Sequence, residues 1–332
     1  MTKKELAFRT ALLFSGSIIS NAFSGLISAG LLKMDGLHGV RGWQWLFIIE
    51  ASLTGLAAIA AFFILPDFPE NSAFLTIEER ALAVARLTAD AGGEADVESK
   101  GKGAKEGVLL ALQDTNVYLL MAIILPITTG LSFNLFFPTL TGTLGYGQTN
   151  TLLLTVPPWT LAALVSFFNG RHADYTGERF LHISVPLVVG IVGFTINAST
   201  MNTAARFVGL FLQASSYATY AIVLSWISNT IPRPMYKRSV ALAAINSVAQ
   251  FGNVAGSYIW SKDKYGPRYW QSNLICATMF LTAIGLAGVL RWRLVRKNRK
   301  LDRRYGTVAE ILAAEGGRPT AETTRMKFRF VL

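Results

Sequence analysis

Length, composition and charge limit what this chain can be. Of its 332 residues, 52% are hydrophobic and only 15% are charged, whereas about a quarter of the residues in a soluble domain are charged. The net charge of +11 is not accompanied by a basic stripe interleaved with stacking aromatic residues, so we expect no nucleic acid partner. The single cysteine, Cys276, excludes a disulfide framework, and three histidines without metal-ligand spacing predict neither a metal site nor a cofactor.

The apolar residues gather into eight runs of about twenty residues, which at 1.5 Å per residue can cross the ~30 Å hydrocarbon core of a bilayer. The sequence therefore predicts an all-α polytopic membrane protein in a lipid bilayer. Membrane enzymes usually carry histidine boxes or paired acids, which this sequence lacks, so we do not expect an enzyme. The predicted spans are 10–32, 42–66, 115–137, 151–168, 182–199, 207–231, 239–260 and 269–290.

The basic residues predict how the chain is oriented. Lysine and arginine collect in the cytoplasmic loops of membrane proteins. If the first span starts inside, the cytoplasmic segments hold all but six of the 31 basic residues, so we expect both termini to be cytoplasmic. The six exceptions are Lys33, Arg41, Arg206, Lys262, Lys264 and Arg268.

The first run is predicted to be a membrane span and not a secretory signal, because the apolar region of a signal is shorter, typically ~7 to 15 residues. Small residues recur along it at every fourth position. Such a stripe lets another helix approach closely, although no partner for it is obvious within this chain. The stripe consists of Gly16, Ser20, Ser24 and Ser28.

Glu50, in the second run, is the only acidic residue inside any of the eight runs. It lies roughly 10 Å inside Trp43, whose ring suits the membrane interface. Desolvation at that depth favours a protonated carboxyl group, so Glu50 is a candidate proton-coupling residue. The alternative is structural: the carboxylate accepts hydrogen bonds from a neighbouring helix or loop and holds the end of the span in place.

Residues 67–114 form the only long polar segment between the runs. Within it, Thr76 and Glu79 match a capping box, which predicts the start of a short amphipathic helix. Residues 91–107 alternate glycine with charged side chains and predict a flexible linker. Asp114 is placed to cap the third span.

Polar residues inside the spans mark a candidate substrate cavity. Pro157 and Pro158, inside the predicted fourth span, free carbonyl groups that neighbouring helices or a water-filled cavity must satisfy. Three amides share one face of the seventh span, and that face is expected to look into the bundle or a polar cavity because amides are costly against lipid. Gly252 and Gly256 in the same span predict close helix packing. The cavity candidates are Asn134, Tyr217, Tyr220, Asn246, Gln250 and Asn253.

A compact inner loop is predicted at 170–179, between the fourth and fifth spans. Asp174 in this loop is a candidate latch, because a carboxylate near the positive N-terminus of the seventh span would hold the inner side closed. The alternative is that Asp174 only caps the loop. The motif residues of the loop are Gly170, Asp174, Gly177 and Arg179.

Two stretches resemble the major facilitator superfamily of transporters. The loop at 170–179 has the spacing Gly-x-x-Ala-Asp-x-x-Gly-x-Arg, which looks like the inner-loop signature of that superfamily, with Tyr175 where a basic residue is usual. Residues 42–50 are similar to a Gly-Trp-Arg-Trp-Ile-Phe-x-x-Glu stretch of its anion:cation symporter branch, with Gln44 replacing the arginine. That branch contains allantoate, nicotinate, biotin and pantothenate permeases.

The resemblance implies a major-facilitator-type bundle of two six-helix halves, and it aligns the eight predicted spans with the fifth to twelfth helices of the family. Residues 1–66 are then the last two spans of an N-terminal half that lacks its first four helices. Residues 67–114 are a cytoplasmic linker, 115–290 are a complete six-span C-terminal half, and 291–332 are a basic cytoplasmic tail.

The resemblance further implies a secondary active transporter in the plasma membrane. It would take up a small organic anion, such as a vitamin or an allantoate-like carboxylate, together with a proton. No lysine or arginine lies within the predicted spans, so the cationic partner of the anion is expected on the helices that this chain lacks. The alternatives are a drug or toxin exporter of the same superfamily, and a non-transporting membrane fragment that pairs with a full-length relative.

Overall fold

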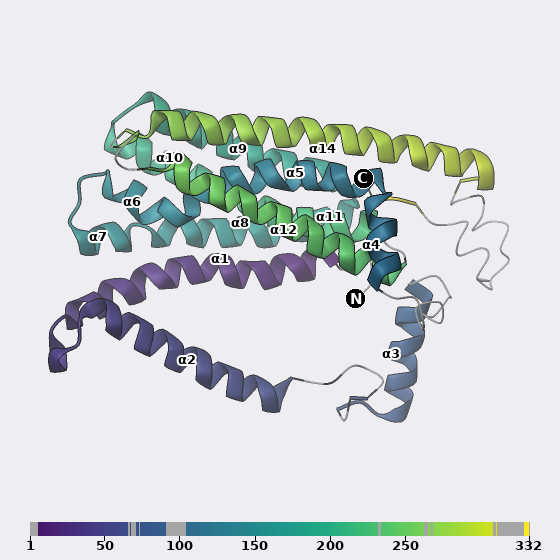
Figure 1. Ribbon diagram of the computed structural model, residues 1–332, viewed down its shortest axis with the longest axis horizontal. Helices are drawn as coiled ribbons and strands as arrows, with labels where there is room; N and C mark the ends of the chain where they lie inside the picture. Colours follow the sequence, from purple (N-terminus) through teal and green to yellow (C-terminus); the bar gives the residue numbers. More distant parts are fainter. Residues whose placement is uncertain are drawn as a thin grey trace.

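The structure is a computed structural model of helices that run side by side, and the regular secondary structure of its described residues is entirely helical (Figure 1). The described residues are 6–65, 67, 71–72, 74–90, 104–231, 234–261, 265–266, 268–307, 310 and 329–331. The α-helices are α1 (Leu6–Leu31), α2 (Gly42–Ile64), α3 (Ile77–Asp90), α4 (Ala104–Leu112), α5 (Thr115–Leu131), α6 (Phe137–Gly142), α7 (Gln148–Leu153), α8 (Val156–Thr176), α9 (Phe180–Ser199), α10 (Thr203–Ser215), α11 (Ala218–Thr230), α12 (Met235–Ile259) and α14 (Trp270–Tyr305). Short 3-10 helices are η1 (Leu32–Met34), η2 (Leu37–Gly39) and η4 (Ser132–Phe136).

Seven of the predicted spans coincide with helices or helix series that are long and apolar enough to cross a membrane. The exception is the predicted span 239–260, which forms α12 within the bundle but is less apolar than those seven. The 25 residues of α12 are enough to cross a ~30 Å core. The all-α polytopic fold is therefore confirmed, while composition alone supports seven spans among the described residues and not eight.

Two predicted spans are interrupted helices. The span 115–137 begins as α5, tightens into the 3-10 helix Ser132–Phe136 and continues as α6. The span 207–231 is divided into α10 and α11 at Ser216 and Tyr217. Both interruptions leave backbone groups outside a regular helical ladder at membrane depth, which requires local hydrogen-bond partners.

The predicted fourth span is interrupted directly before its paired prolines. Pro157 and Pro158 lie in the first turn of α8, not inside a continuous helix, and α7 ends before them at Leu153. Proline suits a first helical turn because its fixed φ matches the helix and the N–H it lacks would have no partner there. The prolines therefore begin a helix.

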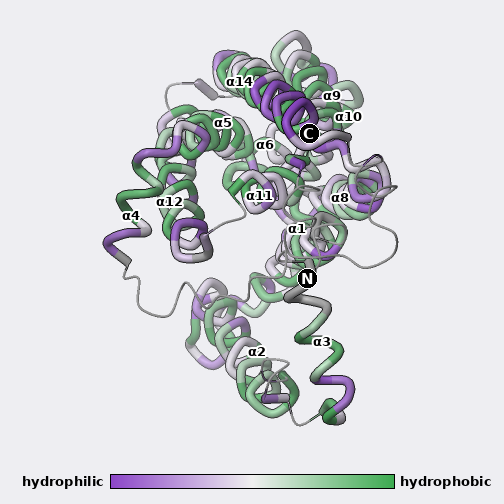
Figure 2. Tube along the Cα trace, turned by 90° about the vertical axis from the view of Figure 1, so that its right-hand side faces the viewer, coloured by the Kyte–Doolittle hydropathy of each residue, from purple (hydrophilic) through white to green (hydrophobic). Residues whose placement is uncertain are grey.

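Two helices continue past their predicted ends. Helix α8 extends to Thr176, where Gly177 ends it with a left-handed φ of 65°, so most of the predicted inner loop at 170–179 is helical. Helix α14 extends to Tyr305 instead of ending near 290. Its 36 residues span ~54 Å at 1.5 Å per residue, so part of α14 lies beyond the membrane core, and Figure 2 shows that part as hydrophilic.

The core of the bundle contains a ring held between two glycines. Phe280 of α14 is fully buried and packs edge-on against Phe194 at 5.4 Å between ring centroids. Its ring occupies the space that a Cβ would need at Gly130 of α5 and at Gly190 of α9. The absence of a side chain at these two positions lets three helices meet around one aromatic residue.

Helix α12 packs along α5 through the predicted glycine pair. A Cβ at Gly252 would meet Thr128, and a Cβ at Gly256 would meet Ser132. Because the backbones are close, the Thr128 hydroxyl donates to the carbonyl of Ala249 at 2.8 Å. The prediction of close helix packing by Gly252 and Gly256 is confirmed.

Helix α1 packs along α8 with one face and leaves the other open. Gly25 lies on the packed face, where a Cβ would meet the side chain of Thr155. Gly16, Ser20 and Ser24 of the predicted stripe are exposed. No atom lies within 4 Å of the position that a Cβ at Gly16 would take, so the stripe has no partner helix among the described residues.

Helix α2 stands apart from the rest of the bundle (Figure 2). It contacts α1 and η1, and Gly42 is its buried residue. Its N-terminus is held by Asp35, whose carboxylate accepts the backbone N–H of Gly42 at 2.7 Å.

The polar segment forms two short helices. The capping box before α3 is confirmed, because Glu79 accepts the backbone N–H of Thr76 at 2.9 Å and the Thr76 hydroxyl accepts that of Glu79 at 3.3 Å. The expected linker is shorter than 91–107, because α4 begins at Ala104 and packs against α12. Residues 91–103 lie outside the described residues. Asp114 caps α5 as predicted, accepting the N–H of Asn116 at 2.9 Å.

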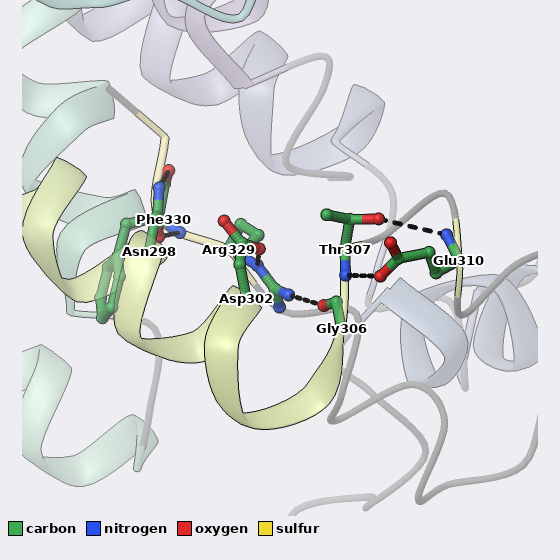
Figure 3. A network of polar contacts seen from close by, with 7 residues as sticks. All are labelled: Asn298, Asp302, Gly306, Thr307, Glu310, Arg329 and Phe330. Carbon is green, nitrogen blue, oxygen red and sulfur yellow. Dashed lines mark hydrogen bonds and ion pairs between the residues drawn. The ribbon is translucent and has the colours of Figure 1, made fainter.

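The described C-terminal residues fold back onto α14 (Figure 3). The Asn298 side chain donates to the carbonyl of Phe330 and accepts its N–H, both at 2.9 Å. Arg329 donates to Asp302 at 2.6 Å. The buried indole of Trp226 on α11 donates to the carbonyl of Val331 at 3.0 Å. The predicted basic tail therefore begins as a helix and docks at 329–331, while 308–309, 311–328 and 332 lie outside the described residues.

Candidate functional site

Both termini of the described chain lie at one end of the bundle, which we call the near end (Figure 1). At this end, Asp174 in the last turn of α8 accepts hydrogen bonds from Arg179 and from Phe8. Its Oδ1 accepts from Nη2 of Arg179 at 2.6 Å, and its Oδ2 accepts from the backbone N–H of Phe8 at 2.6 Å. Phe8 is in the first turn of α1, where backbone N–H groups have no helical partner and the helix dipole favours a negative charge. The structure therefore places Asp174 at the N-terminus of α1, and the contact with the N-terminus of α12 stays a prediction.

Aromatic and charged side chains surround this contact. Phe8 packs edge-on against Phe167 at 5.2 Å, and the Arg171 guanidinium lies over the Phe8 ring at 5.9 Å. Arg179 is buried, and its Nε and Nη1 have no hydrogen-bond partner among the residues that the structure describes. Because a buried guanidinium keeps its charge, the Asp174 carboxylate is its main compensation.

Two further polar pairs involve residues close in sequence to Asp174 and Arg179. Glu178 accepts from Nε of Arg291 on α14 at 3.1 Å. His172 of α8 and His182 of α9 share a hydrogen bond between ring nitrogens 2.7 Å apart. Together with Asp174, these pairs join the near ends of α1, α8, α9 and α14.

Aromatic side chains gather where the interrupted helices meet. Tyr217, at the break between α10 and α11, donates its hydroxyl to the carbonyl of Leu131 at 3.2 Å, and the side chain of Asn134 lies beside that hydroxyl. The Tyr217 ring packs edge-on against Trp159 at 5.1 Å and Phe133 at 5.9 Å. The structure therefore brings two of the predicted cavity residues, Asn134 and Tyr217, together. Trp159 is a neighbour that the sequence reasoning missed.

Tyr220 is one turn further along α11 and faces α1. Its ring packs edge-on against Phe14 at 5.3 Å, and it is partly buried. Tyr220 therefore lies at the contact between α1 and the helices that follow the polar segment.

The three amides of α12 share one face, as the sequence predicts. Asn253 donates to Gln250 at 2.9 Å, and Asn246 lies one turn before them. Asn246 and Gln250 are exposed, because the side of α12 that packs on α5 is the neighbouring one with the two glycines. No described helix covers the amide face.

Glu50 lies on α2 with its side chain exposed. Its backbone carbonyl accepts from the Thr54 hydroxyl at 2.8 Å, but no hydrogen bond to its carboxylate is formed within the described residues. The structure does not bring Glu50 together with the Tyr217 group or with the α12 amides.

The match to a known family decides the identity of this bundle. A family described as the Major Facilitator Superfamily matches residues 1–257. The chain belongs to the Major Facilitator Superfamily. The superfamily resemblance seen in the sequence is thereby confirmed.

Similar proteins of this superfamily are named as transporters. The "Major facilitator-type transporter hxnP" of Emericella nidulans is 31% identical over 95% of this chain and 63% of its own length. The "MFS transporter prlL" of Fungal sp. (strain NRRL 50135) is 30% identical over 93% of this chain and 62% of its own. The "Putative tartrate transporter" of Agrobacterium vitis is 26% identical over 83% of this chain and 61% of its own.

These comparisons place the chain in a family of membrane transporters and not of enzymes. The chain spans a little under two thirds of the length of these superfamily relatives. Across the described residues, no group of three or more His, Cys, Asp or Glu side chains is arranged to hold a metal ion.

The superfamily bundle also contains polar residues that the sequence reasoning missed. Gln213 of α10 donates to Asn273 of α14 at 2.9 Å, and Asn273 donates to the carbonyl of Tyr269 at 2.8 Å. Both amides lie inside apolar runs, so the signal that marked the α12 amides applied to them too. Arg206, predicted to lie between spans, is buried in α10. The expectation of no lysine or arginine within the spans is therefore wrong.

Proposed function

We propose that this chain forms part of a secondary active transporter whose substrate cavity lies where two interrupted helices meet. One observation carries the proposal: Tyr217, at the α10–α11 break, donates to the carbonyl of Leu131, where α5 gives way to η4. Irregular backbone at membrane depth is tolerated where it is buried in protein or lines a cavity. Transporters of this kind bind substrate and coupling ions at such broken helices.

The proposed substrate is a small organic anion. Support comes from the sequence resemblance to the anion:cation symporter branch and from a relative named for tartrate, which is itself a small organic anion. Hydroxyl groups and amide N–H groups can donate to a carboxylate. In this proposal Asn134, Tyr217, Tyr220 and the α12 amides line the cavity.

The proposed cavity needs further helices to close it. Asn246 and Gln250 are exposed on α12, which is costly against lipid, and the small-residue stripe of α1 is exposed as well. The greater length of the relatives is consistent with additional helices. We assign residues 1–66 to one half of the transporter, 115–290 to the other half and 67–114 to the connection between them.

Glu50 is the proposed proton-coupling residue. Its carboxylate forms no hydrogen bond within the described residues, so the alternative structural role has no observed partner. In this proposal a helix outside this chain covers Glu50 in the assembled transporter, because Glu50 is exposed here.

The contact between Asp174 and Phe8 is proposed to close the cytoplasmic side. The near end would be the cytoplasmic end, because basic residues collect on that side of a membrane. At the near end, the last part of α14 from Arg291 to Arg304 is rich in arginine and lysine. We propose the plasma membrane as the location.

Uptake into proteoliposomes tests this function. The 332-residue chain and a lengthened form, preceded by the N-terminal helices of the Emericella nidulans relative, would each be reconstituted. We expect the lengthened form to accumulate labelled tartrate, nicotinate or allantoate when the lumen is alkaline. This accumulation should stop when a protonophore is added. Outward pumping, or no gradient-driven movement of any of the three anions, contradicts the proposal. Saturable uptake by the shorter chain shows that no further helices are needed.

A further inference from the structure

Residues 329–331, which we call the strap, lie outside the helices and are held on α14 through backbone and side chain (Figure 3). The amide of Asn298 donates to the carbonyl of Phe330 and accepts its N–H, both at 2.9 Å. The guanidinium of Arg329 donates to Asp302 at 2.6 Å and to the carbonyl of Gly306, just past the end of α14, at 2.8 Å. A cation is favoured at this end of a helix, so the charge of the strap suits its position.

The strap also reaches α11. The indole of Trp226, in the last two turns of α11, is fully buried and donates to the carbonyl of Val331 at 3.0 Å. An indole has a single N–H donor. Removing the strap would take this bond from a buried donor, which is costly, so the strap and Trp226 hold each other in place.

The ring of Phe330 adds a third attachment. It is half-buried against the hydrophobic core, and the Lys297 ammonium lies 5.5 Å from its centroid. Lys297 in turn donates to Asn116 of α5 at 3.4 Å. The strap therefore contacts α14 and α11 directly, and α5 through Lys297.

The two helices that the strap joins pack mainly against other helices. Helix α14 packs along α5 and α9, whereas α11 packs against α1, α8 and α9, and direct packing between α11 and α14 is slight. The strap thus supplies a link between α11 and α14 that their own packing provides only weakly.

The strap is attached in a way that allows it to detach. Its three residues are half-buried, and the Asp302 side chain that pairs with Arg329 is 40% exposed. Ion pairs that water reaches contribute little to stability, and a short surface segment opens at a lower free energy than the whole fold. The strap can therefore leave its position while the helices stay folded.

We propose that residues 329–331 form a detachable strap that, while docked, holds the near ends of α11 and α14 together. Release of the strap then lets the near end of α11 move relative to α14. Helix α11 begins directly after Tyr217, so the strap restrains a helix of the proposed transport path. That consequence rests on the proposed function, whereas the tests below measure the strap itself and need no transport.

The indole N–H of Trp226 reports docking directly in the 332-residue chain in detergent. With ¹⁵N-labelled tryptophan, Trp226→Phe identifies its NMR signal among the seven tryptophans. Asn298→Leu removes both bonds to Phe330, and Arg299→Leu is the matched control, because it places the same side chain at the next, exposed position. We expect exchange of the Trp226 N–H with deuterated solvent to become at least about tenfold faster in Asn298→Leu only. Equal exchange in the parent chain and Asn298→Leu overturns the strap.

A second variant releases the strap from its own side and covers the case in which Asn298→Leu does not fold. Phe330→Ser removes the ring and leaves α14 unchanged. We expect the same faster exchange at Trp226, and no further increase in the double variant, because both changes act on one contact. Protection of Trp226 that survives Phe330→Ser contradicts the proposal, as do effects of the two changes that multiply independently.

Distances between spin labels test whether the strap holds the two helices together. Labels would be attached at Ser228→Cys on α11 and at Lys300→Cys, an exposed position of α14, in a Cys276→Ser background. We predict a narrow distribution of distances while the strap is docked and a broader one after Phe330→Ser. An unchanged distribution in a chain whose Trp226 N–H has lost its protection overturns the proposed link, because the strap is then released without freeing α11.

Discussion

Asp174, in the last turn of α8, accepts the backbone N–H of Phe8, in the first turn of α1, at 2.6 Å. These residues come from opposite sides of the polar segment, so one carboxylate ties together the two parts of the chain that the segment joins. The same carboxylate compensates the buried Arg179. The contact thus links packing at the near end to the proposed closing of the cytoplasmic side.

Asp174→Asn is expected to destabilise the chain by about 1–3 kcal/mol, because the variant keeps an acceptor but leaves Arg179 buried without a counter-charge. The free energy of unfolding can be measured by denaturant titration in mild detergent. Glu178→Gln is the matched control, because its partner Arg291 has a side chain that is 41% exposed. That pair should contribute less than about 1 kcal/mol. If both variants lose the same free energy of unfolding, the contact of Asp174 with Phe8 and Arg179 stabilises the chain no more than the exposed pair of Glu178 and Arg291 does.

Gly130→Ala is expected to destabilise the bundle by about 1–3 kcal/mol, because its new Cβ would collide with the buried ring of Phe280. Gly285→Ala is the control: it lies on α14 like Phe280, and nothing lies within 4 Å of its Cβ position. We expect the control to be neutral or slightly stabilising, because alanine favours the helix over glycine. Thermal unfolding followed by circular dichroism checks both. A neutral Gly130→Ala would mean that the three helices are not as close as described.

The pair formed by Asp114 and Lys237 predicts a pH dependence. Burial raises the pKa of Asp114, but the Lys237 ammonium at 2.7 Å and the N–H of Asn116 outweigh it, so the pKa lies below its usual value. A lowered folded-state pKa gives stability that is complete above the unfolded-state pKa of ~3.9 and is lost as the pH falls through the folded-state pKa.

The stability difference between the parent chain and Lys237→Gln should therefore be constant from neutral pH down to about pH 5 and shrink below about pH 4. Thermal midpoints measured across this range, with both proteins in the same detergent, give the difference. A difference that grows on acidification would contradict the assigned pKa direction.

Local patterns predicted much of the fold. Apolar runs located the helices, Thr76 and Glu79 located the start of α3, and Gly252 and Gly256 located the close contact of α12 with α5. Each of these signals depends on residues near one another in the sequence or on a single helix face.

The features that depend on tertiary neighbours were not predictable from such patterns. The break at Ser216 and Tyr217 contains neither glycine nor proline. The burial of Arg206 depends on where α6 and α14 lie, and the contact of Asp174 with α1 depends on how the two parts of the chain pack. Charge alone had placed Arg206 in a loop and gave no sign of the contact between Asp174 and α1.

Glu50→Gln in the lengthened transporter separates proton coupling from a structural role. The variant keeps the shape and most of the hydrogen bonding but cannot titrate. If Glu50 carries the proton, the variant should exchange labelled anion across proteoliposomes but not accumulate it against a pH gradient. Accumulation equal to the parent would remove Glu50 as the coupling residue, and loss of both exchange and folding would assign it a structural role.

Substrate protection of a cysteine at position 217 tests most directly whether the meeting point of the interrupted helices is the substrate site. In the lengthened transporter with Cys276→Ser, the variant Tyr217→Cys would be labelled by a water-soluble thiol reagent with and without the transported anion. Met201→Cys, at the exposed far end, is the control. We predict that the anion slows labelling at 217 several-fold and leaves labelling at 201 unchanged. Labelling at 217 that is indifferent to the anion, in a protein that still transports it, would contradict the proposed cavity.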